Sequence, residues 1–167
     1  MSNQPETLTT ADFITTTHRI SGQVQTGPKP MSDLLNDKSQ SFLLAYNVYV
    51  SRLEQAGEIG AHAPVAYLSK ENLNLVIVPA REARASDLGR FAAQDYDALA
   101  TLAGFEVTGT FSGPHRFDLR NFSPAALDSF FPLTEATARV VGTPGLVFNS
   151  EAILINRSRL QSLCLRE

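Results

Sequence analysis

Two glycine-centred segments of this 167-residue chain alternate apolar and polar residues, and the motifs that follow each segment recur in the same order. Residues 20–24 form the first segment and residues 107–111 form the second. In both cases a Gly-Pro pair, an Asp-Leu-x-Asn segment and two adjacent apolar residues come next. Because self-similarity in a fixed order is the signature of a repeated architecture, the sequence predicts an internal duplication.

The five matches lie at offsets of 87, 86, 85, 88 and 80 residues, and the small differences fall where loops are expected. After the glycine-centred segments, the matches are Gly27-Pro28 with Gly113-Pro114, residues 33–36 with 118–121, residues 42–43 with 130–131, and residues 64–75 with 144–155. The last match places Glu71 over Glu151. Two unrelated β segments share glycines and alternation easily, but they do not readily share the later motifs in order.

The local pattern within each unit predicts short strands joined by turns. Strict alternation over four or more residues is typical of a half-buried strand. Gly22 and Gly109 stand on the apolar side of their segments, where a glycine marks a bulge, a bend or a close backbone approach. We predict structural turns at Gly27-Pro28 and at Gly113-Pro114.

We therefore predict a mainly β fold with two tandem Sm-like or SH3-like small β-barrels, related by internal duplication and joined by a helical connector. Units of this size bury modest apolar surface alone, so docking of the two units or oligomerisation would help them. The predicted boundaries are a polar N-terminal tail at 1–16, a first barrel at 17–79, the connector at 80–103, a second barrel at 104–160 and a C-terminal tail at 161–167.

The connector differs in character from the two units, because it is rich in alanine and spaces larger side chains as a helix would. The side chains at near-helical spacing are Phe91, Asp95, Leu99 and Leu102. Asp87 or Ser86 would cap the start of such a helix, and Gly104 follows its end. We expect one or two helical segments here.

The first unit resembles an uncharacterised bacterial domain that carries a glycine strand, a Ser-Asp-Leu-Leu-Asn segment, a Phe-Leu pair and a closing hairpin. In this chain these features are Gly22, residues 32–36, residues 42–43 and residues 65–78. The strand order of that domain is similar to the Sm-like fold, so the resemblance implies this fold for residues 17–79 and, more loosely, for 104–157. The second unit departs from the pattern, with Arg120 in place of Leu35.

Two pairs of residues, Asp33 with Asn36 and Asp118 with Asn121, are the main candidates for binding. They are similar to the acidic residue and asparagine with which Sm proteins contact RNA, although the spacing here is one residue shorter and a turn intervenes. Such side chains could hold a ligand or a metal ion. More often they bond nearby backbone amides in turns and caps, and we expect that structural role.

Charge and composition narrow the function classes. The net charge is −3, and residues 17–79 and 104–160 each carry five basic and five acidic side chains, which argues against a generic nucleic-acid binder. The single Cys164 excludes an intramolecular disulfide framework and a cysteine-rich zinc site. His115 and Arg116 follow the second Gly-Pro pair and could bind an anion, although solvated loop side chains are commoner there. No nucleotide-binding or nucleophile motif is present, so we predict a protein that is not an enzyme, with no catalytic residue, metal site or cofactor.

The leading hypothesis is a non-enzymatic protein-interaction or assembly module whose partner is another protein or copies of itself. Edge strands and the apolar residues 42–50 are the candidate surfaces. Two alternatives stay open: an Sm-like RNA-binding regulator, with nucleic acid possible but not favoured, and a small-molecule sensor whose ligand lies between the two units. The chain begins without a secretory signal and has no apolar run of the ~20 residues that span a bilayer, so we expect a cytoplasmic bacterial protein.

Overall fold

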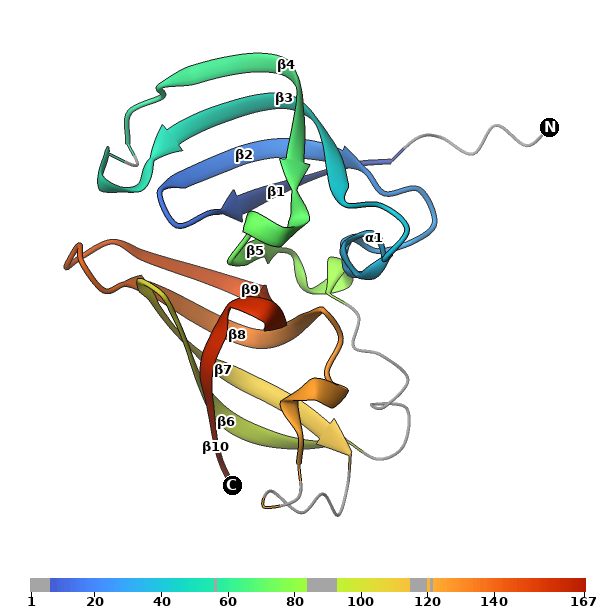
Figure 1. Cartoon of the computed structure of the whole chain (residues 1–167), viewed down its shortest axis with the longest axis vertical. Helices are drawn as coiled ribbons and strands as arrows, with labels where there is room; N and C mark the ends of the chain where they lie inside the picture. The colour runs from blue at the N-terminus through green and yellow to red at the C-terminus, as the bar shows by residue number, and fades with distance from the viewer. Residues whose placement is uncertain (1–6, 56, 84–92, 115–119, 121) are drawn as a thin grey trace.

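The chain forms one ten-stranded antiparallel sheet that stays open rather than closing into a barrel (Figure 1). The structure is a computed structural model and describes residues 7–55, 57–83, 93–114, 120 and 122–167. Neighbouring strands follow the order β10-β6-β7-β8-β9-β5-β1-β2-β3-β4. Within the described residues, helix is limited to one short α-helix and single 3-10 turns. The predicted mainly β class is confirmed, whereas two separately closed barrels are not observed.

Most strands are joined by short connections. The strands are β1 (Leu8–Ile14), β2 (His18–Gln25), β3 (Phe42–Arg52), β4 (Ala61–Ser69), β5 (Leu75–Val78), β6 (Ala93–Leu102), β7 (Phe105–Pro114), β8 (Phe130–Val140), β9 (Val147–Asn156) and β10 (Leu160–Arg166). The α-helix is α1 (Met31–Asn36), and the 3-10 turns are η1 (Leu53–Gln55), η2 (Lys70–Asn72), η3 (Ala80–Glu82), η5 (Pro124–Ala126) and η6 (Arg157–Arg159).

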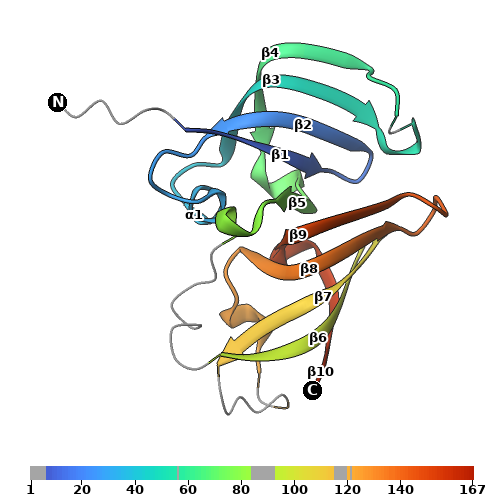
Figure 2. The same cartoon turned by 180° about the vertical axis from the view of Figure 1, so that it is seen from behind.

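The sheet consists of two halves with the same strand order. We call residues 8–83, from β1 to η3, the first half, and residues 93–166, from β6 to β10, the second half. The order β5-β1-β2-β3-β4 of the first half recurs as β10-β6-β7-β8-β9 in the second. The halves meet where β5 pairs with β9, with Leu75 opposite Ile155, and these two strands lie side by side at the centre of the molecule (Figure 2).

The strand registers repeat at a nearly constant offset. Ala11 faces Gly22 in the first half, and Ala98 faces Gly109 in the second, so equivalent positions differ by 87. In β3 and β8 the offset is 88, because Phe42 faces Ser69 as Phe130 faces Asn156. The described registers therefore agree with the internal repeat predicted for the first segments.

One part of the predicted alignment is wrong. Leu68 faces Leu43 as Ile155 faces Phe131, so residues 61–69 correspond to residues 148–156 at an offset of 87 rather than 80. The predicted match of residues 64–75 with 144–155 is wrong because one short apolar run resembles another in sequence. Which residues pair depends on the neighbouring strand in the folded sheet, and a single sequence does not show that pairing.

Three segments assigned to tails or connector contain strands. The predicted tail at 1–16 includes β1, whose Phe13 and Ile14 are fully buried. In the predicted helical connector at 80–103, η3 is followed by strand β6 from Ala93, and residues 84–92 lie outside the described residues. The predicted tail at 161–167 lies almost entirely in β10. These strands were missed because threonine, alanine and serine fill several of their inward positions, which weakens the apolar alternation.

Each half contributes side chains to the hydrophobic core of the other. Phe130, Ala152 and Leu154 of the second half are buried among the core residues of the first half, beside Leu35 and Val76. In return, Ile14, Leu53 and Leu75 of the first half belong to the core of the second half. The junction is thus a continuous packed interior rather than a contact between two finished surfaces.

Both predicted strand glycines lie at a bulge. The register of β2 with β3 shifts around Gly22, and the register of β7 with β8 shifts around Gly109. Opposite them, Asn47 and Glu135 adopt left-handed backbone angles, with φ of 49° and 46°. A Cβ on Gly109 would lie 2.9 Å from the carbonyl oxygen of Thr134, so this glycine permits a close backbone approach. The bulges reverse which side of β3 and β8 faces the core.

Candidate protein-interaction surface

Of the predicted binding residues, Asn36 has a clear structural role at the junction of the halves. Its Nδ2 donates to the carbonyl of Phe130 at 3.1 Å, and its Oδ1 accepts from the N–H of Phe130 at 2.7 Å. Asp33 is half-buried in the first turn of α1. The other candidates, His115, Arg116, Asp118 and Asn121, lie outside the described residues. For Asn36 the expected bonding to backbone is found, but across 94 residues of chain rather than within a local turn.

Of the two predicted Gly-Pro turns, the first is a turn in the structure and the second is part of a strand. Gly27 and Pro28 lie in the turn between β2 and α1, where Gly27 has a φ of 55°. Gly113 and Pro114, in contrast, end strand β7, where Gly113 pairs with Gln94. The equivalence of the two Gly-Pro pairs is therefore one of sequence and not of backbone conformation.

A cation occupies equivalent positions in the two halves and bonds to the short helical element beside it. The Lys70 Nζ donates to the carbonyls of Leu34 at 2.6 Å and Asp37 at 3.0 Å. The Arg157 Nη1 donates to the carbonyl of Ala125 at 3.0 Å and also to that of Leu127. Both cations therefore cap backbone carbonyls at the ends of short helical turns.

The electrostatic surroundings of Lys70 shift two pKa values. Burial lowers the pKa of Lys70 from its ordinary value of 10.5, and the charge of Asp37 opposes that shift. The pKa of Asp37 is lowered, chiefly because its carboxylate accepts hydrogen bonds from the Ser39 hydroxyl and backbone N–H. Both side chains therefore make hydrogen bonds within the chain at this end of α1, and these bonds stabilise the fold.

Asn156 connects the end of β9 to the first half. It is 4% exposed, and its Nδ2 donates to the carbonyl of Leu73 at 2.7 Å and to that of Lys70 at 3.3 Å. Its Oδ1 accepts from the N–H and hydroxyl of Ser158. The sequence analysis missed this residue, although a polar side chain directly after the apolar residues 152–155 is a detectable signal of a buried hydrogen-bonding role.

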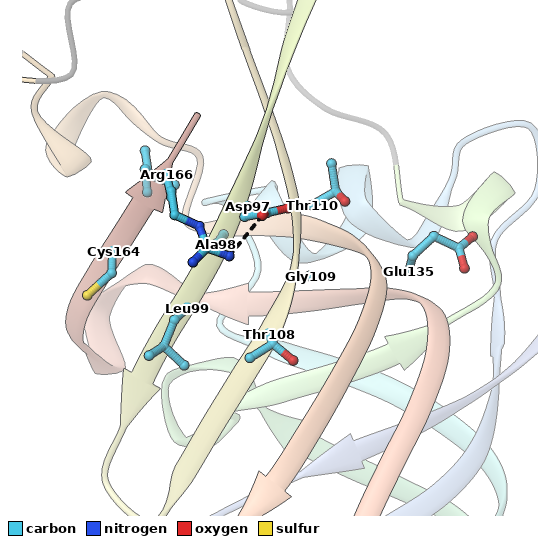
Figure 3. Close-up of a pocket in the computed structure, with 10 residues that line it drawn as sticks. Asp97, Ala98, Leu99, Thr108, Gly109, Thr110, Glu135, Cys164 and Arg166 are labelled. Carbon is cyan, nitrogen blue, oxygen red and sulfur yellow. Dashed lines mark hydrogen bonds and ion pairs between the residues drawn. The ribbon is translucent and has the colours of Figure 1, made fainter.

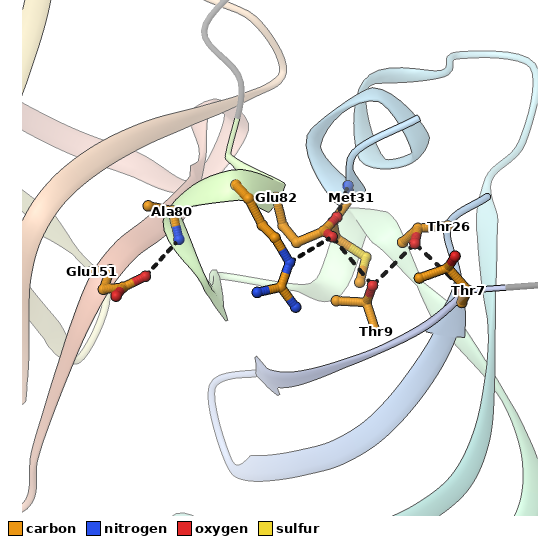
Figure 4. A network of polar contacts seen from close by, with 8 residues as sticks. Thr7, Thr9, Thr26, Met31, Ala80, Glu82 and Glu151 are labelled. Atoms are coloured by element: carbon orange, nitrogen blue, oxygen red, sulfur yellow. Dashed lines mark hydrogen bonds and ion pairs between the residues drawn. The ribbon is translucent and has the colours of Figure 1, made fainter. Parts of the chain in front are cut away.

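A second polar network closes the first half around Glu82 (Figure 4). The Glu82 carboxylate is buried, and its Oε2 accepts from the backbone N–H of Met31, at the start of α1, at 2.8 Å. Its Oε1 accepts from the Thr9 hydroxyl at 3.2 Å, and Thr9 in turn bonds to Thr26. Glu82 therefore links β1, the residue that follows β2 and the start of α1, and acts as a structural anchor.

The outer faces of the two halves differ sharply in exposure. We call the side chains of Phe42, Leu44, Tyr46, Val65 and Tyr67 the open face. Cross-strand pairing places Leu44 opposite Tyr67 and Tyr46 opposite Val65, so all lie on one side of β3 and β4. Phe42 is 57% exposed and Tyr67 is 72% exposed.

The equivalent side chains of the second half are buried. Phe130 takes the place of Phe42 and is 3% exposed, and Leu154 takes the place of Tyr67 and is fully buried. Ala152, in the place of Val65, is also fully buried. These residues pack into the core of the first half, so this face of a half is a surface that docks onto another half. The predicted interaction surface at residues 42–50 thus contains part of an exposed apolar patch, while Val48 points into the core because of the bulge.

A groove of about 590 Å³ runs beside β10 (Figure 3). Asp97 and Leu99 of β6, Thr108 of β7 and Cys164 of β10 line it, and Arg166 bonds to Asp97 at 3.1 Å. Cys164 is a free, exposed thiol. No histidine is among the described residues that line this groove.

The described residues contain no group of three or more His, Cys, Asp or Glu side chains that could hold a metal ion. None of the helices in the described ranges is long and apolar enough to cross a membrane. No protein-family model, curated protein or solved structure matches the chain.

Proposed function

We propose that this chain is a non-enzymatic protein-interaction and assembly module, built from two duplicated Sm-like units, and that it binds its partner through the open face. The observation that carries the proposal is the contrast between equivalent faces. One is buried against a neighbouring half and the other, on the first half, is exposed at the edge of the sheet. A contiguous exposed apolar patch of this kind marks an interaction site.

The chemistry of the open face favours a protein partner over a nucleic acid. None of its five side chains is charged, whereas binding to a phosphate backbone relies on lysine and arginine. Two of the five are tyrosines, which are enriched at protein interfaces because they combine a large apolar ring with a polar tip. The unpaired backbone edge of β4 adds hydrogen-bonding groups that a partner strand would satisfy.

The test is the assembly state of the full chain, measured by native mass spectrometry and light scattering. We expect the purified protein to be part of a complex, and we expect the double variant Val65→Lys/Tyr67→Lys to lose it. Loss of a buried aromatic contact at an interface costs ~2 kcal/mol or more, which is about 30-fold in Kd.

The matched control is Val141→Lys. Val141 is likewise exposed, at 59%, but it lies outside the open face. We expect this variant to assemble as the wild type does. A wild-type chain that is monomeric at every concentration, carries no partner and is unaffected by the double substitution would disprove the proposed function.

A further inference from the structure

The two edge strands of the sheet lie at opposite ends of the strand order. Among the described strands, β4 pairs only with β3, and β10 pairs only with β6 (Figure 1). Building on the proposed function, we propose that the partner of the open face is a second copy of this chain, whose β10 pairs with β4 head to tail. The partner is argued from the junction between the two halves, which contains the same two kinds of edge.

The junction supplies a template for the register. Strand β10 occupies in the second half the position that β5 occupies in the first, and β4 corresponds in the same way to β9. In the junction, Val76 of β5 faces Leu154 and Ile77 faces Ile153. At the offset of 87 residues, a pairing of β10 with β4 of another copy places Leu163 opposite Tyr67 and Cys164 opposite Ala66.

Burial on β10 is incomplete where its counterpart is fully enclosed. Leu163 and Leu165 are only half-buried, and both pack at the margin of the second half's core. Their counterparts in β5, Val76 and Val78, are 0% and 2% exposed because β9 and the first half enclose them. Both edges therefore carry apolar surface that the equivalent strands bury, and each supplies what the other lacks.

The groove beside β10 differs from its counterpart in the first half, because a strand of the neighbouring half borders the counterpart. An equivalent groove in the first half runs beside β5 and is lined by Ala11, Ile77 and Val78, with Asn149 and Glu151 of β9 as its outer wall. In the second half, Ala98, Cys164 and Leu165 line the corresponding groove (Figure 3). Here β10 pairs with no described strand other than β6, so nothing in the described residues takes the place of β9. In the head-to-tail arrangement, residues 62–64 of the next copy occupy the position of residues 149–151.

The repeating contact uses two different surfaces, one from each end of the chain. Such a heterologous contact leaves one free edge at each end of a linear assembly and leaves none in a closed ring. Because edge pairing in a ring satisfies every exposed strand, a discrete oligomer is the expected form.

Two variants that each damage one edge test the arrangement directly. Val65→Lys/Tyr67→Lys damages β4, and Cys164→Lys changes an exposed side chain of β10 without touching the core. Each variant alone should be monomeric by native mass spectrometry. An equimolar mixture should form a one-to-one dimer and nothing larger, because the intact β10 of one chain pairs with the intact β4 of the other.

The outcomes separate this inference from the proposed function. If Cys164→Lys assembles as the wild type does while the β4 variant is monomeric, the open face binds its partner without β10, and the head-to-tail arrangement is wrong. A mixture of two monomeric variants that forms no dimer also contradicts it. If neither substitution changes a monomeric wild type, the proposed function itself fails.

A disulfide trap checks the register without relying on loss of assembly. Paired residues of antiparallel strands have Cα atoms ~4.5–5.5 Å apart, a separation that a disulfide spans. Ala66→Cys should therefore crosslink to Cys164 of another copy under mild oxidation and give a ladder on a non-reducing gel. Ala61→Cys is the matched control, since its position lies five residues from the predicted pair, and it should not crosslink. Equal crosslinking of both variants, or none with Ala66→Cys, would overturn the register.

Discussion

The two halves of this protein share a strand order and a register, yet the same face is interior in one and surface in the other. In the second half, Phe130 and Leu154 complete a neighbouring core. In the first half, Phe42 and Tyr67 hold the equivalent positions and remain exposed. Both halves therefore have the same face, but the single junction between them buries this face in the second half only.

The largest difference between the halves should appear when equivalent residues of the two faces are truncated. Leu154→Ala opens a cavity in the shared core and should lower the free energy of unfolding by about 2–5 kcal/mol. Tyr67→Ala, at the equivalent exposed position, should change it by less than about 0.5 kcal/mol in dilute protein. Urea denaturation monitored by circular dichroism measures both. Equal losses would mean that the two faces are equally buried, which contradicts the comparison.

The next effect concerns the residue that ends each fourth strand. Asn156→Ala removes an amide that bonds to the carbonyls of Lys70 and Leu73, and it should cost about 1–3 kcal/mol because those buried carbonyls lose a donor. Ser69→Ala at the equivalent position loses a single exposed contact with Asn72 and should be nearly neutral. Urea midpoints of the two variants give the difference, and a neutral Asn156→Ala would show that the junction does not need this amide.

The bulges allow a finer comparison. A methyl group on Gly109 meets the backbone oxygen of Thr134 at 2.9 Å, whereas one on Gly22 meets first the Val48 side chain at 3.1 Å. A backbone atom of a central strand yields less than a methyl group, so Gly109→Ala should cost about 1–3 kcal/mol and Gly22→Ala clearly less. Thermal unfolding ranks the two variants, and the reverse order would indicate that the second bulge is the more adaptable one.

The smallest effect is a pH dependence that separates the two helix-capping cations. Because the pKa of folded Lys70 lies below 10.5, the unfolded chain binds more protons between those two pKa values. Stability should therefore rise as pH increases through this window and level off above 10.5. Arg157→Gln is the matched control, because it removes the equivalent cation of the second half and leaves Lys70 unchanged. Urea midpoints from about pH 8 to about pH 11 should show the rise in wild type and in Arg157→Gln, and lose part of it in Lys70→Gln.

Local patterns in the sequence predicted the parts of the fold that depend on neighbouring residues. The irregularities expected at Gly22 and Gly109, which prove to be bulges, and the turn at Gly27-Pro28 follow from alternation and backbone freedom. The polar strand β1 and the alanine-rich strand β6 were assigned otherwise, because tertiary pairing outweighed their weak local preference.

The candidate site could be predicted only in outline. Residues 42–50 were recognised as an apolar surface, but the equivalent burial of Phe130 and Leu154 depends on contacts between segments far apart in the chain. The role of Asn36 likewise required the position of Phe130, which lies 94 residues later. Such long-range pairings leave no spacing signal in a single sequence.

The shared interior also affects how this protein is made. The core of the first half is complete only when Leu154 is in place, long after the last strand of that half at residue 78 has been synthesised. At the usual rate of about 5–20 residues per second, the first half waits about 4–15 s on the ribosome with its own core uncovered. During that interval the nascent chain exposes the apolar surface that its own later segment covers in the folded protein, and exposed apolar surface of this kind makes a folding intermediate prone to aggregation.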